Sequence, residues 1–259
     1  MTEQISPDIA RLLIAEAERL NSPAFIDADP VQFPRRFTDP RDIEVAALLC
    51  ATIAWGNRTM ICRNCERMLG VLEWQPYNYI MDEAYETLPD GNVHRTFFNA
   101  NLRHYLRGLH RVFSRYGSVE GLARERGIAS EQAPAWALAR ELNRELAEAN
   151  DGCADSRCLP QNLDNTALKR LNMALRWLVR RDGIVDLGVW DVLEPSQLYI
   201  PLDVHVGNTA RDLGLLDRRS NDRRAAVQLT EALRSLRPDD PVVFDFALFG
   251  LGIEAKSVR

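Results

Sequence analysis

A chain of 259 residues, 46% apolar and 27% charged, has the size and composition of a globular protein that buries its own core. Its longest apolar run, residues 45–55, is too short to cross a bilayer, and no basic stretch followed by an apolar one opens the sequence, so we expect neither a membrane protein nor a secretory precursor. The odd number of cysteines, five, indicates reduced thiols in a cytoplasmic protein.

The charge is unevenly distributed along the chain. A net charge of −5 argues mildly against a nucleic-acid-binding protein, because phosphate contacts supply much of the affinity for such a partner. Residues 168–237, however, carry 12 Lys or Arg against 9 Asp or Glu, a net charge of +3. A locally basic face on an acidic protein is compatible with DNA binding, although it does not require it.

Apolar residues recur at helical spacing along nearly the whole chain, and the sustained alternation typical of strands is absent. We therefore expect an all-α protein, with Tyr199–Leu202 extended but too short to form a sheet. The predicted helices lie near residues 5–20, 42–55, 58–72, 99–115, 130–149, 166–181, 204–213, 221–236 and 240–251.

A segment rich in Asp, Asn and Pro, Asn150–Asn165, is the clearest interruption of the helical pattern. We place a lobe boundary near it. The chain, 1–259, is then a single domain with lobes of roughly 1–150 and 151–259, and the C-terminal helix is a candidate addition to the first lobe. The segment also supplies Asp164 or Asn165 as the cap of the helix that follows.

Lys169 stands out within the predicted helix 166–181. Only two of the 32 basic residues are lysines, Lys169 and Lys256, and the excess of arginine is itself typical of an arginine-rich proteome. A lysine amine can lose its proton and act as a nucleophile, which a guanidinium cannot do. A position in the first helical turn near Arg170 and Arg176 favours the neutral amine, because the helix dipole and like charges oppose a further positive charge.

Two sides can be distinguished on this helix. The spacing predicts a buried apolar side made of Leu168, Leu171, Ala174, Leu175 and Leu178. A second side carries Lys169, Asn172, Arg176 and Arg180. This positive stripe has two interpretations. It binds a phosphate backbone, or its arginines pair with acids elsewhere in the fold.

Asp203 ends the apolar run Tyr199–Leu202 and precedes a predicted helix. The residue is either a plain helix cap or a carboxylate held at a helix start, where it can stabilise positive charge or move a proton. We interpret His205 as a supporting or packing residue beside it. A zinc site built from Cys62, Cys65, Cys153 and Cys158 is a further possibility, but the spacings suit no common site.

Several motifs together resemble a bacterial family defined only as a conserved domain of unknown function, and the resemblance covers almost the whole chain. The motifs are Arg41–Ala47, Ala54–Arg58, Arg115–Ser118, Lys169–Arg180, Pro201–Val206 and Asp240–Gly252. That family is in turn distantly similar to the helix-hairpin-helix DNA glycosylases. The 34 positions that separate Lys169 from Asp203 look most like the archaeal 8-oxoguanine DNA glycosylases.

The resemblance implies roles for individual residues. Lys169 and Asp203 correspond to the catalytic pair, and the Asp-x-x-x-aromatic spacing of Asp245 and Phe249 fits a pocket for a flipped base. Trp55 is a candidate stacking face, although it and Phe249 are equally well interpreted as core aromatics. The DNA backbone would be contacted by Arg170, Asn172, Arg176 and Arg180.

The sequence departs from the glycosylase pattern in two places. The hairpin of that pattern has glycines, whereas Leu159–Thr166 has none, so Asn162 or Asn165 would have to supply left-handed backbone. The arginine common three residues after the histidine is Asn208 here. Because of these departures, a second interpretation stays open, in which the protein is a relative that binds nucleic acid without catalysis. A third interpretation is a protein-interaction module.

We therefore expect an all-α, two-lobed bundle like that of the helix-hairpin-helix DNA glycosylases, with a cleft between the lobes. The expected activity is that of a base-excision repair glycosylase and AP lyase that removes an oxidised purine, such as 8-oxoguanine, through a Schiff base on Lys169. The expected partner is double-stranded DNA containing a damaged base. The protein is expected to be a cytoplasmic, nucleoid-associated monomer that needs no cofactor or metal and binds no membrane.

Overall fold

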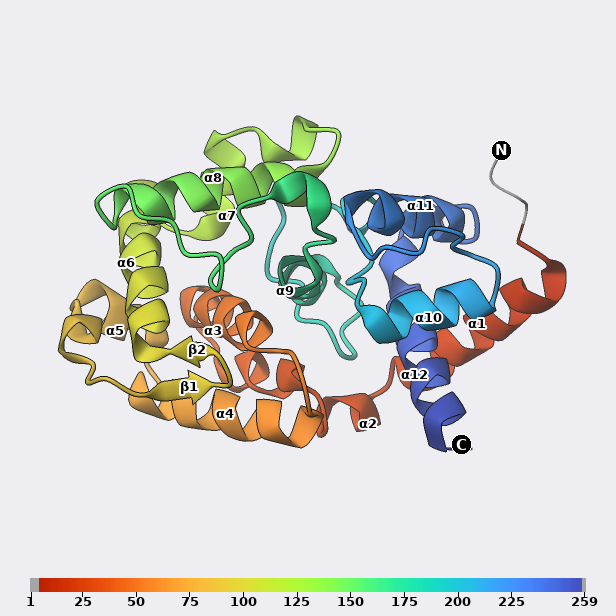
Figure 1. Cartoon of the computed structure of the whole chain (residues 1–259), viewed down its shortest axis with the longest axis horizontal. Helices are drawn as coiled ribbons and strands as arrows, with labels where there is room; N and C mark the ends of the chain where they lie inside the picture. Colours follow the sequence, from red (N-terminus) through yellow and green to blue (C-terminus); the bar gives the residue numbers. More distant parts are fainter. Residues whose placement is uncertain (1–4, 258–259) are drawn as a thin grey trace. The chain divides into compact units, whose positions relative to one another are not determined.

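The computed structural model describes the backbone of residues 5–257 and the side chains of residues 5–253, and the chain is mostly helical with one two-stranded sheet (Figure 1). The all-α prediction is thereby confirmed at the level of class. The chain divides into two compact units, each described separately below. Unit 1 holds the described residues up to Phe25 and from Asp164 onward, and unit 2 holds Ile26–Leu163.

The division differs from the lobes predicted from composition. Its boundary lies at residue 163 rather than near residue 150 because the intervening segment is tied to unit 2 by hydrogen bonds. Asn150 Nδ2 donates to the carbonyl of His104 at 3.0 Å, and Asn101 Nδ2 donates to Asp155 Oδ2 at 2.6 Å. The first helix and the C-terminal helix both belong to unit 1.

Unit 1 is organised around its C-terminal helix, which packs against helices from both ends of the chain (Figure 1). Gly250 lies against Leu20, and a β-carbon at Gly252 would lie 2.7 Å from Thr209 Oγ1, so the glycines allow these helices to approach closely. None of the helices within the described part of the chain is long and apolar enough to span a bilayer. The helices of unit 1 are α1 (Pro7–Leu20), α9 (Lys169–Val179), α10 (Val204–Asp212), α11 (Arg223–Arg234) and α12 (Phe244–Ser257).

Unit 2 combines helices with a small antiparallel sheet, in which Asn92 pairs with Phe98 and His94 with Phe97. The sequence pattern did not predict the sheet or the short helices α2, α5 and α7, because segments this short carry little periodicity. The elements are α3 (Pro40–Thr52), α4 (Arg58–Val71), α5 (Pro76–Met81), β1 (Asn92–His94), β2 (Phe97–Phe98), α6 (Asn99–Tyr116), α7 (Val119–Glu125) and α8 (Pro134–Glu148), while α2 (Pro23–Ile26) spans the sequence boundary between the units.

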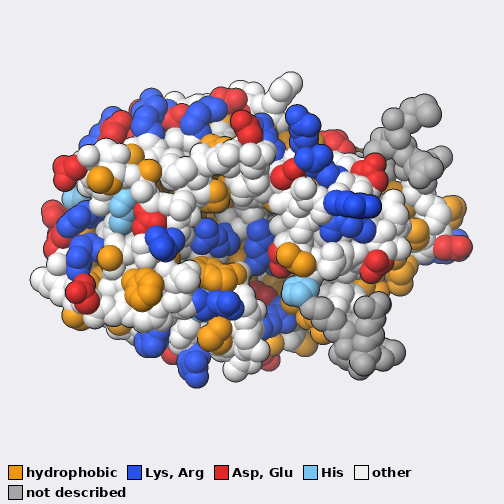
Figure 2. Space-filling model, viewed as in Figure 1, with side chains coloured by type: hydrophobic (Ala, Val, Ile, Leu, Met, Phe, Trp, Pro, Cys, Tyr) orange, Lys and Arg blue, Asp and Glu red, His pale blue; other side chains and the backbone are white. Residues whose placement is uncertain are grey.

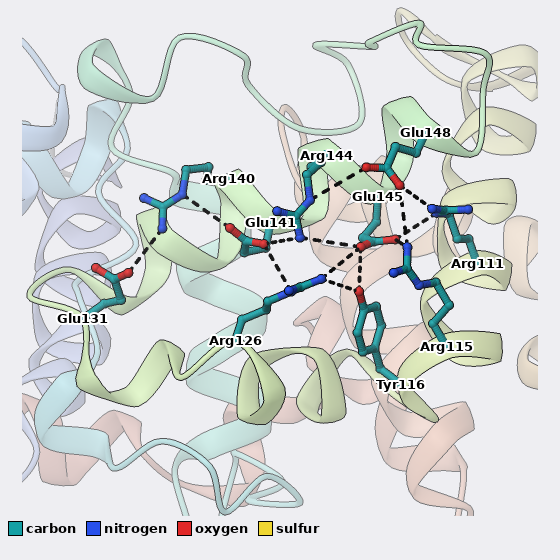
Figure 3. A network of polar contacts seen from close by, with 10 residues as sticks. All are labelled: Arg111, Arg115, Tyr116, Arg126, Glu131, Arg140, Glu141, Arg144, Glu145 and Glu148. Carbon is teal, nitrogen blue, oxygen red and sulfur yellow. Dashed lines mark hydrogen bonds and ion pairs between the residues drawn. The ribbon is translucent and has the colours of Figure 1, made fainter.

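Helix α6 is joined to α8 by close packing and by a polar network. A β-carbon at Gly108 would lie 2.5 Å from Leu146 Cγ, so this glycine lets the two helices approach. Glu145, whose side chain is 0% exposed, accepts from Arg111 Nε at 2.9 Å and from the Tyr116 hydroxyl at 2.8 Å (Figure 3). Arginines and glutamates alternate around it, so its charge is balanced and the network holds the helices together.

Candidate functional site

Lys169 is the first residue of α9, and its side chain is half-buried. The preceding Leu168 has left-handed backbone, with φ of 49°, and no side chain caps the helix. The predicted cap at Asp164 or Asn165 is therefore wrong, since the helix begins later and Thr166 Oγ1 instead accepts from the Leu168 N–H at 3.1 Å. The Lys169 amine lies 3.5 Å from Met173 Sδ.

The sequence predicted left-handed backbone at Asn162 or Asn165, but the structure has it at Leu168, directly before Lys169. Neither Asn162 nor Asn165 has positive φ, whereas Leu168 does. For a residue with a branched side chain this conformation costs on the order of 1 kcal/mol, and such costs persist where the surrounding structure requires them. Leu168 is buried, so packing fixes the backbone that carries the lysine.

The apolar side of α9 is buried as predicted, at Leu168, Leu171, Ala174, Leu175 and Leu178. The polar side is buried as well: Asn172 is 1% exposed, Arg176 3% and Arg180 2%. Asn172 Nδ2 donates to the carbonyl of Ala167 at 2.9 Å. The prediction that these three residues form a solvent-facing stripe for the DNA backbone is therefore wrong, and of the four predicted backbone contacts only Arg170 is more than marginally exposed.

The two buried arginines pair with acids that lie elsewhere in unit 1, as the alternative interpretation of the stripe required. Arg176 Nε lies 3.2 Å from Asp186 Oδ1, and its Nη1 donates to Asp245 Oδ2. Arg180 Nη1 lies 2.5 Å from Asp186 Oδ2, and its Nε lies 2.9 Å from Asp240 Oδ2. These acids compensate the desolvation of the guanidinium groups, which burial without partners would make very costly.

Phe246 gives the arginine pair an aromatic surface. The Arg176 guanidinium carbon lies 4.4 Å from the centre of its ring, and that of Arg180 lies 5.6 Å away. The ring of Phe25, in α2, contacts the ring of Phe246 edge to face, with centroids 4.9 Å apart. Cation–π contacts of this kind add to the ion pairs, so this end of α12 is firmly anchored to α9.

Asp203 is the N-cap of α10, as one of the two interpretations of the sequence proposed. Its Oδ1 accepts from the backbone N–H of His205 at 2.8 Å and of Val206 at 3.0 Å. The extended segment before it is held by Thr230, whose hydroxyl oxygen accepts from the Ile200 N–H at 3.1 Å. His205 thus supports Asp203 through its backbone, and its side chain is exposed.

The backbone of Asp203 is also held from the segment between α10 and α11. Asn221 Nδ2 donates to the Asp203 carbonyl at 3.0 Å, and Asn221 Oδ1 accepts from Arg211 Nη2 at 2.5 Å. Gly207 makes room for this contact, since a β-carbon there would lie 2.5 Å from Asn221 Oδ1. The position of the Asp203 carboxylate is therefore fixed from both sides of the turn.

Asp245 is the residue at which the candidate site converges. It lies in the first turn of α12 and is 8% exposed. Burial raises the pKa of Asp245 to about 6, the positive charges of Arg176 and Lys169 act in the opposite direction, and the carboxylate of Asp203 adds to the rise. The same carboxyl group is bound by Arg176 of the lysine helix, and Asp203 begins α10, which packs against α12.

The predicted base pocket draws on residues of both units. In unit 1, Phe249 is half-buried one turn after Asp245, and its ring centroid lies 6.2 Å from that of Phe25. In unit 2, the ring of the half-buried Trp55 lies 4.7 Å from that of His94, at 90°. Both aromatics are therefore partly packed, in agreement with their alternative interpretation as core residues, and each retains some exposed surface.

Trp55 is held in place through a buried histidine. His94 Nε2 lies 2.8 Å from the Trp55 carbonyl oxygen, and Asn64 Nδ2 lies 2.8 Å from His94 Nδ1. Because the amide of Asn64 donates to Nδ1, the histidine proton resides on Nε2, which donates to Trp55. Burial lowers the pKa of His94, which favours the neutral ring that this arrangement requires.

Sequence reasoning missed the ion pairs that Arg176 and Arg180 make, and it missed the Asn221 contact to Asp203. Asp182 and Asp186 follow the arginines closely in sequence, which is a signal that a search for acids near the stripe would have used. The zinc hypothesis for the cysteines is not supported, because no cluster of three or more metal-ligating side chains occurs among the residues whose placement the structure gives.

The chain belongs to a protein family of unknown function (DUF2400), whose model matches residues 29–254. This agrees with the resemblance of its motifs to an uncharacterised conserved domain. No curated protein and no solved structure matches the chain.

Proposed function

We propose that the protein is a DNA glycosylase and AP lyase that excises a damaged base, with Lys169 as the nucleophile and Asp203 as the acid that assists it. The observation that carries this proposal is that the lysine helix is bound to Asp245 of α12 through Arg176, while Asp203 begins α10, which packs against α12. The three residues come from separate elements, so their convergence is a property of the tertiary structure. Clusters of charged groups with a shifted pKa are typical of catalytic sites.

The motif similarity to the helix-hairpin-helix DNA glycosylases supplies the reaction. The target nucleotide leaves the stack, and the neutral Lys169 amine attacks C1′ of the deoxyribose. The C1′–N bond breaks, its electron pair leaves with the base, and a proton passes to that base. The nitrogen lone pair then forms the C1′=N bond as the C1′–O4′ bond breaks, and O4′ takes up a proton from solvent. The resulting protonated Schiff base loses a C2′ proton, and the electron pair of that bond forms C2′=C3′ and expels the 3′ phosphate by β-elimination.

The environment of each residue suits its proposed role. The backbone N–H groups that bind Asp203 Oδ1 hold the carboxylate in one orientation, so it can stabilise positive charge on the sugar without first reorganising. Lys169 begins α9, where the helix dipole favours a neutral amine. Arg176, two turns along the same helix, donates to Asp245 and so holds this carboxyl group beside the lysine helix.

The substrate that this proposal favours is an oxidised purine such as 8-oxoguanine, in double-stranded DNA. This choice rests on the lysine-to-aspartate spacing and on the Asp245 and Phe249 spacing, both similar to those of archaeal 8-oxoguanine DNA glycosylases. Phe249 retains exposed surface on α12 and can stack on a flipped base.

Borohydride trapping tests the proposal, because borohydride reduces a Schiff base to a stable covalent adduct. We expect an adduct on a duplex containing 8-oxoguanine, and none on an undamaged duplex. Lys169→Arg keeps the positive charge near Asp245 but cannot form the Schiff base, so it should abolish the adduct, whereas Lys256→Arg should not.

Asp203→Asn separates the chemistry of the carboxylate from its role in the fold. Asparagine caps helices as well as aspartate does, so the variant should fold normally. Loss of the charge should slow excision on the order of 10²–10⁴-fold. If duplexes with any of several lesions bind tightly and none gives an adduct, the protein is a nucleic-acid-binding relative without catalysis, and the enzymatic proposal is wrong.

A further inference from the structure

The burial of Asn172, Arg176 and Arg180 removes three of the four phosphate contacts that the sequence suggested. The segment Arg218–Arg224 runs from the loop after α10 into the first turn of α11 and has four arginines and one aspartate. Figure 2 shows basic side chains gathered over the region of these two helices. We infer that this arginine segment binds the phosphodiester backbone of duplex DNA; the inference rests on the proposed function and names the surface that holds the substrate.

The side chains of the arginine segment reach solvent. Arg219 and Arg224 are exposed, and Arg218 and Arg223 are half-exposed. Asp222 is the segment's one acid and is already engaged, since its Oδ1 accepts from Arg218 Nε at 2.8 Å and from the Ala225 N–H at 3.1 Å. The segment therefore presents surplus positive charge at the surface, which an anionic backbone would neutralise.

The arginine segment is ordered by contacts made from beneath it. The Arg211 guanidinium donates to the carbonyl oxygens of Arg218 and Arg219, each at 2.8 Å. The Arg211 guanidinium, together with the Arg218–Asp222 pair, thus shapes the turn, whereas the exposed side chains of Arg219 and Arg224 lie at its surface. A surface fixed in this way loses little conformational entropy when it binds a ligand.

The arginine segment also contacts the backbone of Asp203 and the stretch of chain that precedes Lys169. Asn221 binds the carbonyl of Asp203, and Arg223 Nη1 lies 3.4 Å from Asp164 Oδ1 in the approach to the lysine helix. A strand whose phosphates are bound by Arg219 and Arg224 would consequently lie at a fixed distance from Asp203. These arginines would position the DNA and would not read its sequence.

Binding of undamaged duplex DNA, measured by fluorescence anisotropy at several salt concentrations, tests the inference independently of catalysis. Arg219→Ala/Arg224→Ala should weaken binding about 10- to 100-fold near 0.1 M salt and reduce the slope of log K against log salt by about 2. Arg219→Lys/Arg224→Lys should retain most of the affinity, because phosphate contacts depend mainly on charge.

The matched control is Arg11→Ala/Arg19→Ala, which removes the same charge from α1 of the same unit, where each arginine pairs with an acid one helical turn away. It should bind DNA within about twofold of the unaltered protein, since exposed pairs of this kind carry little free charge. An equal loss in the control would show a general charge effect and overturn the inference, as would undiminished binding by the Arg219/Arg224 alanine variant.

Two further outcomes separate this inference from the proposed function. If the unaltered protein forms the adduct while the alanine variant still binds undamaged duplex normally, the surface is wrong and the enzyme stands. If binding depends on the arginine segment while no lesion gives an adduct, the surface stands and the enzyme does not. Tighter binding of a duplex RNA of the same sequence, with the same dependence on these arginines, would overturn the assignment to DNA.

Discussion

Replacing Asp245 by asparagine should change how the stability of the protein depends on pH. Burial raises the pKa of Asp245 from 3.8 to about 6 in the folded protein. A carboxyl group whose pKa is higher in the folded chain than in the unfolded one stabilises the fold at low pH, and this contribution is lost as the pH rises through about 6. At about 1.36 kcal/mol for each pH unit, the full effect is about 3 kcal/mol, of which about 2 kcal/mol falls between about pH 4.5 and 7.5.

Urea unfolding of the unaltered protein and of Asp245→Asn, followed by circular dichroism across this pH range, measures the effect. The free energy of unfolding of the unaltered protein, minus that of the variant, should fall by about 2 kcal/mol from about pH 4.5 to 7.5. The comparison cancels the titration of the other carboxylates. Asp164→Asn is the control, because the Asp164 side chain is 88% exposed and its variant should follow the unaltered protein. Parallel curves for Asp245→Asn would refute the assignment of a buried, proton-binding carboxyl group.

Substitutions at three other positions test the contacts within each unit. Glu145→Ala leaves Arg111 and the Tyr116 hydroxyl without their buried acceptor, so it should lower the free energy of unfolding, measured in urea, by about 2–4 kcal/mol. Glu148→Ala, at a half-exposed position, should lower it by less than about 1 kcal/mol. Gly108→Ala should lower the melting temperature, because its β-carbon would lie 3.0 Å from Leu146 Cα and force α6 from α8; an unchanged melting temperature would contradict this packing. Asp203→Ala should cost about 1 kcal/mol through loss of the cap and Asp203→Asn almost nothing, and equal losses in the two variants would exclude the capping role.

Local pattern predicted the helices well where they are long and amphipathic. The apolar side of α9 follows from the spacing of Leu171, Leu175 and Leu178, and these residues are buried. The cap at Asp203 follows from the change from extended to helical sequence, and its two backbone hydrogen bonds agree. In both cases the deciding interactions lie within a few residues, so the sequence alone contains them.

The arginines on α9 pair with Asp186, which is near in sequence, but also with acids far away in sequence. Asp245, which receives Arg176, is 69 positions from it, and Asp240 is 60 positions from Arg180. A periodic stripe of positive charge has the same sequence pattern whether it faces solvent or a set of buried acids, so only tertiary structure decides between them. The packing of α1 against α12 is non-local in the same sense, and composition alone does not indicate that the two helices share a unit.

The residue that becomes covalently linked to the DNA is the most direct measure of the proposed reaction. The sequence has two lysines, so mass spectrometry of peptides from a borohydride-reduced complex distinguishes them readily. We predict that the adduct lies on the peptide containing Lys169. An adduct on Lys256, or a stable complex with a damaged duplex that carries no adduct, would contradict the account.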